Sequence, residues 1–368
     1  MLASRATLSS VGVGDADASP TAALLLSVLQ ESAGRIATIL FAHRFGSALE
    51  PECKMYRLLA DVLNDIGFAL DCLSPAFPKP TRVLILSFSS VLRALCGVAA
   101  GSAKASLSAH FARWGNLGEL NAKDSSQETV ISLMGMLVGS LVVSWVTTPL
   151  ATWTTLALLL SVHLETNRRA VRAVSMRTLN RQRATLVYHH LCQGHIPSPE
   201  EVSAQERIFE RSGVLRAADD TSLGHCMIGS SFSDLLHAVR AERKTPQSFH
   251  MSDRTLLKTF KTYEDRQYVL CSIPGSRPCQ VQVVAKRDAT AIELLTAWWQ
   301  ALCLADKWDR AQASNLQTDE DLMLQLQQSM SMAVNLVRDN AARLRASGWD
   351  LDSNALETVS SSRVAAEL

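Results

Sequence analysis

Three charged residues have a spacing that could serve chemistry inside a helical bundle. Arg57, Asp61 and Asp65 follow one another at intervals of four residues, so a helix would stack them along one face. Inside a membrane bundle such charges pair with one another or face a water-filled cavity, as they do in transporters. On a solvated helix each pair would add only about 0.3–0.5 kcal/mol of stability. The sequence leaves both interpretations open.

A second charged group stands at the start of the most apolar stretch of the chain. Lys123, Asp124 and Glu128 precede a run to Glu165 that contains no Asp, Glu, Lys or Arg. The residues from Ser125 to Glu128 match the S-x-x-E capping box, which predicts that a helix begins at Ser125, anchored at a membrane surface. Alternatively, the three charged residues line a polar site at the mouth of a helix bundle.

The sequence lacks the common motifs of enzymes. It contains no G-x-S-x-G, H-E-x-x-H or G-x-G-x-x-G. The segment "YHHLCQGH" contains zinc-ligand types in His189, His190, Cys192 and His195, but adjacent histidines point to different helix faces and the spacing matches no four-ligand array. We therefore expect no catalytic residue, no metal site and no cofactor.

Composition separates the chain into two unlike parts. The net charge of +1 offers no bulk positive field for nucleic acid. The 8 cysteines are dispersed without a C-x-x-C pair, which is typical of reduced thiols. Up to about residue 164 the sequence is apolar with scattered charges, and beyond it the composition is that of a soluble protein.

Several apolar segments have the length and period of helices. Residues 21–45 and 54–73 show helical spacing, and residues 83–103 form an apolar run interrupted only by Arg93. The run 129–164 exceeds one membrane span of about 20 residues, so we expect Pro149 to divide it into two helices. The arginines that follow match the positive-inside bias of a membrane flank: Arg168, Arg169, Arg172, Arg177, Arg181 and Arg183.

Two glycine pairs predict close helix packing. Gly97 and Gly101 lie four residues apart in one apolar run, and Gly135 and Gly139 do so in the other. Glycines at this spacing flatten a helix face and admit a neighbouring backbone.

The C-terminal part predicts a small mixed domain. Residues 267–273 and 280–286 read as two strands joined by a turn, residues 289–306 as a helix with Trp298 and Trp299 in its core face, and residues 319–346 as another helix before Gly348. The expected fold is mainly α, a helical and membrane-embedded bundle followed by an α+β domain. The expected divisions are a poorly ordered segment 1–19, the bundle 20–187, a linker with a short helix 188–230 and the α+β domain 231–368.

Several blocks closely resemble the root-UVB-sensitive family, formerly a domain-of-unknown-function family. The resemblance runs from about residue 11 to residue 183 and weakly beyond, and its most specific pieces are "AKDSSQET" at 122–129 and "ADVLND" at 60–65. Members usually carry an upstream block resembling "LP-x-GFP-x-SV-x-x-DY", and this chain starts after that block. The resemblance implies a eukaryotic, membrane-associated, non-enzymatic protein linked to UV-B response, vitamin B6 homeostasis and auxin transport.

Three hypotheses about function follow from the residues and the resemblance together. The first is a non-enzymatic protein in an organellar membrane, with the lipid bilayer and another family member or a second copy as partners and with no nucleic acid. A transporter-like bundle for a small solute competes within that class. The second hypothesis is a soluble helical scaffold that buries 129–164. The third, an enzyme acting on a pyridoxal-type vitamer, would need a Schiff-base lysine beside a phosphate cradle, and no stretch of the sequence offers both.

Overall fold

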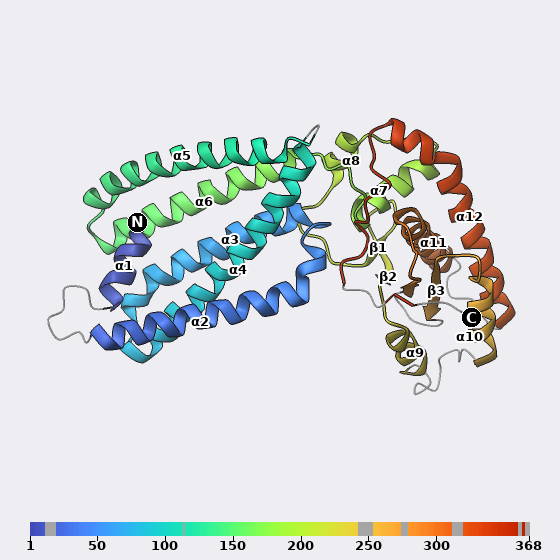
Figure 1. Ribbon diagram of the computed structural model, residues 1–368, viewed down its shortest axis with the longest axis horizontal. Coiled ribbons are helices and arrows are strands. Elements are labelled where there is room, and N and C mark those ends of the chain that lie inside the picture. The colour runs from blue at the N-terminus through green and yellow to red at the C-terminus, as the bar shows by residue number, and fades with distance from the viewer. Residues whose placement is uncertain are drawn as a thin grey trace. The chain divides into compact units, whose positions relative to one another are not determined.

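The computed structural model consists of two compact units, Met1–Ala173 and Val174–Leu368 (Figure 1). It describes residues 1–11, 20–112, 115–241, 253–273, 279–310, 319–359 and 363–364. The boundary at Ala173 lies before the expected one at 187, which falls inside helix α7 (Arg181–Cys192). The reason is that α7 packs into the hydrophobic core of the second unit through Ala184, Val187 and Leu191.

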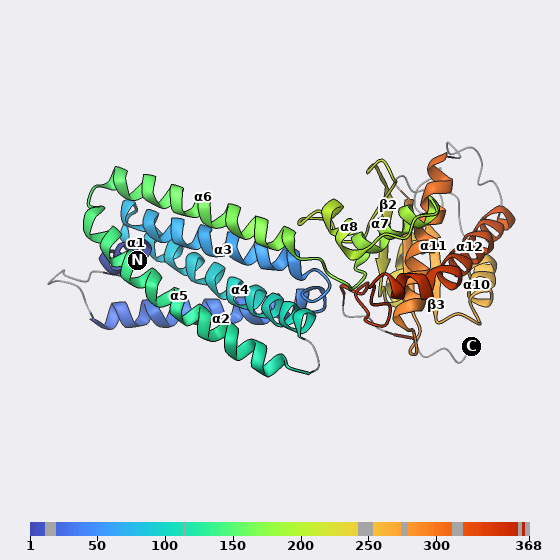
Figure 2. The ribbon, with the colours of Figure 1, turned by 90° about the horizontal axis from the view of Figure 1, so that it is seen from above.

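The N-terminal unit is made of helices that lie along a common direction (Figure 2). Helix α4 packs on α2 and α3, and α3 also contacts α6 and α1. The helices are α1 (Leu2–Val11), α2 (Pro20–Phe45), α3 (Cys53–Leu73), α4 (Lys79–Phe111), α5 (Leu117–Trp145) and α6 (Pro149–Ala173), with short 3-10 turns at Gly46–Ala48 and Ser74–Ala76. The helices predicted at 21–45 and 54–73 are thus confirmed, and the apolar run 83–103 forms the middle of a longer helix.

The uncharged stretch forms two helices, as Pro149 predicts. Helix α5 ends at Trp145 and α6 begins at Pro149, where a missing backbone N–H costs nothing. The predicted helix start at Ser125 is wrong, because α5 begins at Leu117 and Ser125 lies inside it. The good helix formers between Leu117 and Lys123 extend the helix toward the N-terminus, so the capping-box pattern has no free helix end to cap.

The first residues are helical, although the sequence indicated poor order over 1–19. Leu2 and Ala3 of α1 are buried, and α1 packs against α3. The Arg5 guanidinium donates to the Val146 carbonyl oxygen at 3.0 Å, where α5 ends. Residues 12–19 lie outside the described part of the chain.

Close helix packing occurs at glycines other than the four predicted. A Cβ added at Gly97, Gly101 or Gly135 would meet nothing within 4 Å, and at Gly139 it would meet only the flexible Met1 side chain. The close approaches are at two glycines that face α4. A Cβ at Gly34 would lie 3.2 Å from Ala94 Cβ, and one at Gly67 would lie 3.4 Å from Arg93 Cγ. Spacing predicts a flat helix face but not whether that face turns inward.

The C-terminal unit is built around a four-stranded sheet in the order β1-β2-β4-β3. Strands β1 and β2 pair antiparallel, β3 and β4 pair antiparallel, and β2 pairs parallel with β4. The strands are β1 (Val214–Arg216), β2 (Ser222–Ile228), β3 (Tyr268–Ile273) and β4 (Cys279–Ala285), and the other helices are α8 (Pro199–Gln205), α9 (Phe232–Ala241), α10 (Asp253–Thr262), α11 (Ala291–Arg310) and α12 (Asp319–Ala346). The predicted pair of strands and both predicted helices are confirmed.

The segment expected to be a linker with a short helix, 188–230, does contain a short helix, α8, but the rest of it is also structured. It holds the end of α7, helix α8 and the strands β1 and β2. These elements are short, β1 being only 3 residues, so their apolar patterns are too brief to stand out in the sequence. At the start of α8 the Ser198 and Glu201 side chains form the reciprocal capping box that Ser125 does not.

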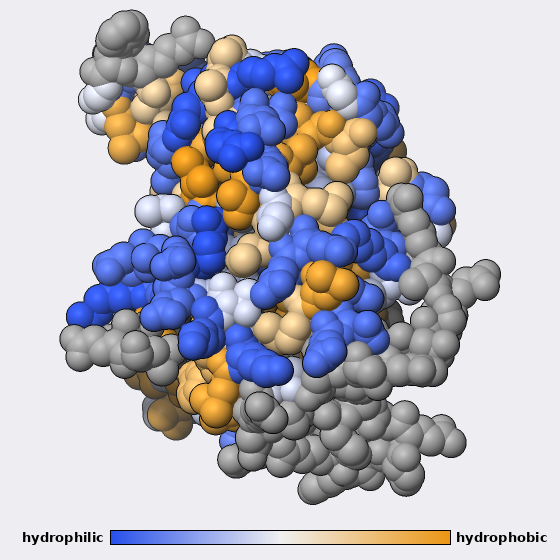
Figure 3. Space-filling view, turned by 90° about the vertical axis from the view of Figure 1, so that its right-hand side faces the viewer, coloured by the Kyte–Doolittle hydropathy of each residue, from blue (hydrophilic) through white to orange (hydrophobic). Residues whose placement is uncertain are grey.

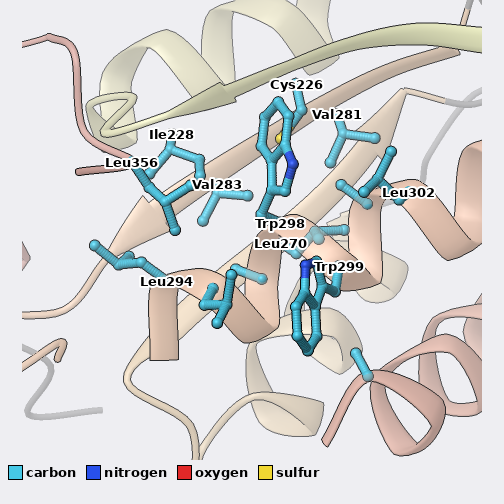
Figure 4. Packing of buried hydrophobic residues seen from close by; sticks show 14 of the residues in the cluster. Cys226, Ile228, Leu270, Val281, Val283, Leu294, Trp298, Trp299, Leu302 and Leu356 are labelled. Atoms are coloured by element: carbon cyan, nitrogen blue, oxygen red, sulfur yellow. The ribbon is translucent and has the colours of Figure 1, made fainter. Parts of the chain in front are cut away.

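Helix α11 lies across the sheet and supplies two fully buried tryptophans, Trp298 and Trp299 (Figure 4). Their rings pack among apolar residues of β2, β3 and β4, and their indole N–H groups find acceptors on α7. Trp298 Nε1 donates to Thr185 Oγ1 at 3.0 Å, and Trp299 Nε1 donates to the Ala184 carbonyl at 2.9 Å. The indole rings fill the core, and their hydrogen bonds also hold α7 to α11.

The first and last segments of the C-terminal unit are joined in what we call the closing seam: Arg177, Arg181 and Pro197 on one side and Trp349, Asp350 and Leu356 on the other. The Asp350 N–H donates to the Arg177 carbonyl at 2.9 Å. The Arg181 guanidinium donates to the Leu356 carbonyl at 2.8 Å, and Trp349 Nε1 donates to the Pro197 carbonyl at 2.9 Å. Two of the arginines expected to flank a membrane, Arg181 and Arg183, are buried here instead.

Candidate polar site in the N-terminal helical unit

Three aspartates of α3 are buried although each can carry a charge. Asp61, Asp65 and Asp71 lie on the side of α3 that faces neighbouring helices, and Asp65 and Asp71 are only 4% and 2% exposed. Burying a carboxylate is costly unless a positive or hydrogen-bonding group faces it. We refer to Asp61, Asp65 and Asp71 with their partners as the α3 row.

Asp71 is held by α4. The Arg93 guanidinium forms an ion pair with Asp71 Oδ2, and the Ser89 hydroxyl lies 2.6 Å from Asp71 Oδ1. Ser89 is also within hydrogen-bond distance of the Gly67 carbonyl, at 3.0 Å. Gly67 lies at this contact, where an added Cβ would lie 3.4 Å from Arg93 Cγ and 3.5 Å from Ser89 Oγ. The arginine guanidinium supplies the positive charge that the buried carboxylate needs.

Asp61 and Asp65 have partners on different helices. Arg57, one turn earlier on α3, donates to Asp61 Oδ1 at 3.0 Å, which is the pairing that the spacing predicts. Asp65 instead faces His163 of α6, whose Nδ1 lies 3.0 Å from Asp65 Oδ2. Nδ1 is also 3.0 Å from Oδ1, but only Oδ2 has hydrogen-bond geometry.

Two buried oxygen atoms of the row accept no hydrogen bond from the described residues. They are Asp61 Oδ2 and Asp65 Oδ1, on successive turns of the same helix face. The charges that act on Asp61 include those of Arg57, His163 and Asp65, so these four side chains form one electrostatic cluster. This part of the row has spare acceptor capacity for a proton or a polar ligand.

The other three predicted residues lie elsewhere and are exposed. Asp124 and Glu128 of α5 both pair with Lys104 of α4, at 2.8 and 2.6 Å. Lys123 pairs with Glu119 on its own helix at 2.5 Å. The structure therefore divides the six predicted residues into a buried group on α3 and a solvated group on α5, and exposed pairs of the second kind contribute little to stability.

Sequence reasoning missed most of the partners of the α3 row. His163 lies within the uncharged stretch, where a count of Asp, Glu, Lys and Arg does not register it. Arg93 was visible as the one charge interrupting an apolar run, yet nothing in the sequence joins it to Asp71. Nothing in the sequence marked Ser89 as a partner of the row, or Lys104 as the partner of Asp124 and Glu128 on α5.

The outer surface of the N-terminal unit is apolar. Helix α5 has no buried residue, and its exposed side chains include Ile131, Leu137 and Leu141. Exposed leucines and isoleucines also cover α2, among them Leu25, Ile39 and Leu40. Among the described residues, α4 and α5 are the two helices long and apolar enough to cross a membrane.

The predicted histidines of α7 and the turn after it have separate partners, and no group of possible metal ligands occurs among the described residues. His189 Nε2 bonds to the Arg216 carbonyl at 2.8 Å, His190 faces Gln205, and His195 faces Glu201. Burial lowers the pKa of His189, although its bond to the Arg216 carbonyl acts in the opposite direction. On the face of this unit that Figure 3 shows, hydrophilic residues predominate and apolar residues form separate groups.

These features define a class of two-unit protein, in which a helical unit with buried charged residues is followed by an α+β unit. The model of a family described as the vitamin B6 photo-protection and homoeostasis domain matches residues 1–195. Several curated relatives carry root UVB sensitive names. The chain belongs to the root UVB sensitive family.

The relatives differ in how far they match. RUS family member 1 of Dictyostelium discoideum is 41% identical over 56% of this chain and 40% of its own length. Protein root UVB sensitive 3 of Arabidopsis thaliana is 32% identical over 84% of this chain and 68% of its own length. Protein root UVB sensitive 2 of the same plant, named as chloroplastic, is 24% identical over 85% of this chain and 65% of its own length. The chain thus spans roughly two thirds or less of the length of these relatives. No solved structure matches it.

Proposed function

We propose that residues 1–173 form a non-enzymatic, membrane-embedded domain that carries a small polar solute across an organellar membrane. The observation that carries the proposal is the reversed polarity of the N-terminal unit. Charged side chains of α3 are buried, while leucine, isoleucine and valine side chains cover the outside of α2 and α5.

Water is a poor solvent for such a surface. Exposed apolar area costs about 25 cal/mol per Å², and monomeric soluble proteins rarely expose contiguous apolar patches beyond a few hundred Å². A bilayer removes that cost, since its hydrocarbon is as apolar as leucine. Within a bilayer, ionisable residues face the bundle interior and pair with one another, as Asp71 and Arg93 do.

The family gives the solute class to test first. Its description names vitamin B6 homoeostasis, so a B6 vitamer is the natural candidate for the polar cargo. One relative is named as chloroplastic, which supports an organellar membrane. The partners that fit the apolar outer surface are the lipid bilayer and, along the unburied helix α5, a second copy or another family member.

Membrane insertion is tested by alkaline carbonate extraction of membranes from cells expressing the full chain. The proposal expects the protein to stay in the pellet and to dissolve in mild detergent, which excludes aggregation. Release into the supernatant would overturn it and favour a soluble scaffold whose apolar helices are covered by a partner protein.

Solute movement is tested by uptake of labelled pyridoxine and pyridoxal into proteoliposomes containing the purified chain. Asp61→Asn and Asp65→Asn should abolish uptake, because each removes a charge of the buried row. Asp124→Asn is the matched control, since Asp124 is exposed and pairs only with Lys104. Uptake that persists in both α3 variants would count against the transport proposal.

A further inference from the structure

The α3 row contains two kinds of ion pair. Asp71 and Asp61 face arginines, whose guanidinium groups stay charged at every physiological pH. Asp65 faces the imidazole of His163, at 3.0 Å. Imidazole is the side chain type that gains and loses its charge between about pH 5 and 8, so this pair differs from the other two in the kind of group that faces the carboxylate.

The charges around Asp65 do not balance while His163 is neutral. Arg57 contributes one positive charge, whereas Asp61 and Asp65 contribute two negative charges, so the cluster is left with one net negative charge. A net charge among side chains as buried as Asp61 and Asp65 is unfavourable. One proton on His163 makes the cluster neutral.

The hydrogen-bond geometry indicates where that proton binds. An ionised carboxylate only accepts hydrogen bonds, so Nδ1 of the neutral imidazole carries the proton that it shares with Asp65 Oδ2. The incoming proton therefore binds at Nε2. The His163 side chain is 39% exposed, so the imidazole is not sealed inside the unit.

Asp61, with its free Oδ2, is the other described group of the cluster that can take up a proton, and the remaining groups around the pair do not compete for this position. From α4, the Cys96 thiol lies within electrostatic range of Asp61, Arg57 and Asp65, but it adds no positive charge. Arg93 is engaged by Asp71, and Arg5 of α1 by the carbonyl oxygens of Val143 and Val146 at the end of α5. Asp61 Oδ2 and Asp65 Oδ1 are free of hydrogen bonds from described residues, so both remain available as acceptors around the added charge.

We propose that His163 and Asp65 form a proton-binding site that holds α6 to α3 when the imidazole is protonated and weakens that contact when the proton leaves. One proton enters from solvent, binds Nε2 and changes the charge of the cluster from one negative to zero. This inference deepens the proposed transport function and rests on it for its biological role, because a site of this kind would couple the bundle to a proton gradient.

The test is the titration of His163 in the full chain, labelled with ¹⁵N-histidine and held in lipid nanodiscs. Imidazole ¹⁵N spectra are recorded from pH 4.5 to 8.5, and the signal of His163 is assigned by its loss in His163→Gln. The proposal expects a titration within this range. In Asp65→Asn the midpoint should fall by about one pH unit, because the carboxylate that favours the charged imidazole is gone.

Asp71→Asn is the matched control, since it neutralises a buried aspartate of the same helix that does not touch His163. Asp61→Asn gives a second variant and should lower the midpoint less than Asp65→Asn does, because Asp61 acts on His163 without a hydrogen bond. The absence of a titration in the unsubstituted chain, or equal midpoints in the Asp65 and Asp71 variants, would overturn the proposal.

This measurement involves no solute, so it separates the two proposals. A His163 signal that titrates as expected in a protein without uptake activity would support the proton site and dismiss transport. Uptake by a protein whose His163 does not titrate would keep transport and overturn the proton site.

Discussion

Trp145 and Trp298 are the same residue type in the two units, and they meet opposite environments. Trp145 at the end of α5 is 86% exposed, whereas Trp298 of α11 is fully buried against the sheet. The leucines follow the same division, since Leu141 of α5 is 64% exposed while Leu294 and Leu302 of α11 are buried. Helix formation is common to both units, so the difference lies in where each unit places its apolar side chains.

Buried charge differs between the units as well. The N-terminal unit places a row of aspartates along one helix, and one of them has only an imidazole as its partner. The C-terminal unit buries Arg183 against Glu206 at 2.8 Å, and Arg183 also donates to the Thr178 carbonyl, which fixes the start of α7. A pair with permanent charges fits a structural role, whereas a row that includes a titratable partner fits a role in which charge changes.

Replacing the two tryptophans gives the largest expected contrast. Trp298→Ala should destabilise the C-terminal unit by about 3–5 kcal/mol, because it opens a cavity in the core. It also removes the bond to Thr185. Trp145→Ala should change the stability of the N-terminal unit in detergent by no more than about 0.5 kcal/mol. Denaturant titration read by limited proteolysis of each unit measures both values. Equal losses of stability in the two variants would contradict the difference between the two tryptophan environments.

Adding a charge to an exposed leucine tests which solvent surrounds each unit. Leu141→Arg on α5 should cost about 2.5–3.5 kcal/mol of membrane insertion, since arginine is disfavoured in the hydrocarbon. Leu257→Arg on α10 is the matched control, because Leu257 is 70% exposed in the C-terminal unit. The fraction of each variant retained after carbonate extraction gives the result. Full retention of the Leu141 variant would show that α5 does not contact lipid.

Removing one partner of the Asp71–Arg93 ion pair should have a smaller effect on stability. Asp71→Ala leaves Arg93 without its carboxylate and should cost about 2–3 kcal/mol, below the value for a fully buried pair because Arg93 is partly exposed. The loss should appear as a lower thermal unfolding midpoint in detergent. Adding Arg93→Leu to this variant should recover part of it, and a double variant less stable than the single one would contradict the ion-pair account.

The smallest expected effect is on the pH dependence of the stability of the C-terminal unit. Its direction is opposite to that expected for the contact between His163 and Asp65. Burial lowers the pKa of His189, so the unfolded chain binds its proton more readily than the folded chain does. The free energy of unfolding should therefore fall as pH drops below about 6.5, by at most about 1.4 kcal/mol per pH unit, until the lower folded pKa is passed. Denaturant unfolding of the C-terminal unit between pH 4.5 and 8 measures the slope.

His189→Gln is the variant that isolates this residue, because its amide can still donate to the Arg216 carbonyl while it cannot take up a proton. The slope below pH 6.5 should be shallower in the variant. A slope equal to that of the unsubstituted chain would assign the response to other groups.

Local sequence patterns predicted the elements whose determinants are local. The bounds of α12 follow from apolar residues at helical spacing that end before Gly348, whose φ of 103° suits glycine. The Arg57–Asp61 pair could be predicted because both residues lie on one helix, a single turn apart. The start of α5 could not, since the Ser125 motif and the upstream helix formers compete and the longer helix prevails.

Partners on different helices could not be predicted from the sequence. Asp71 with Arg93 and Asp65 with His163 are brought together by helix packing, which depends on the close approach at Gly67 and on the fold of the whole bundle. The same holds for strand β2, whose parallel pairing with β4 joins residues on either side of α9, α10 and β3. An isolated short strand gives no indication of its partner.

The closing seam sets an order of events during synthesis. The seam bonds of Arg177, Arg181 and Pro197 are made to Trp349, Asp350 and Leu356, which leave the ribosome much later. Residues 1–173 are by then complete, and domains generally fold as units from the N-terminus onward. The helical unit can thus assemble while the start of the C-terminal unit is still open. The bonds of the seam therefore form late, after both of the segments that they join have been made.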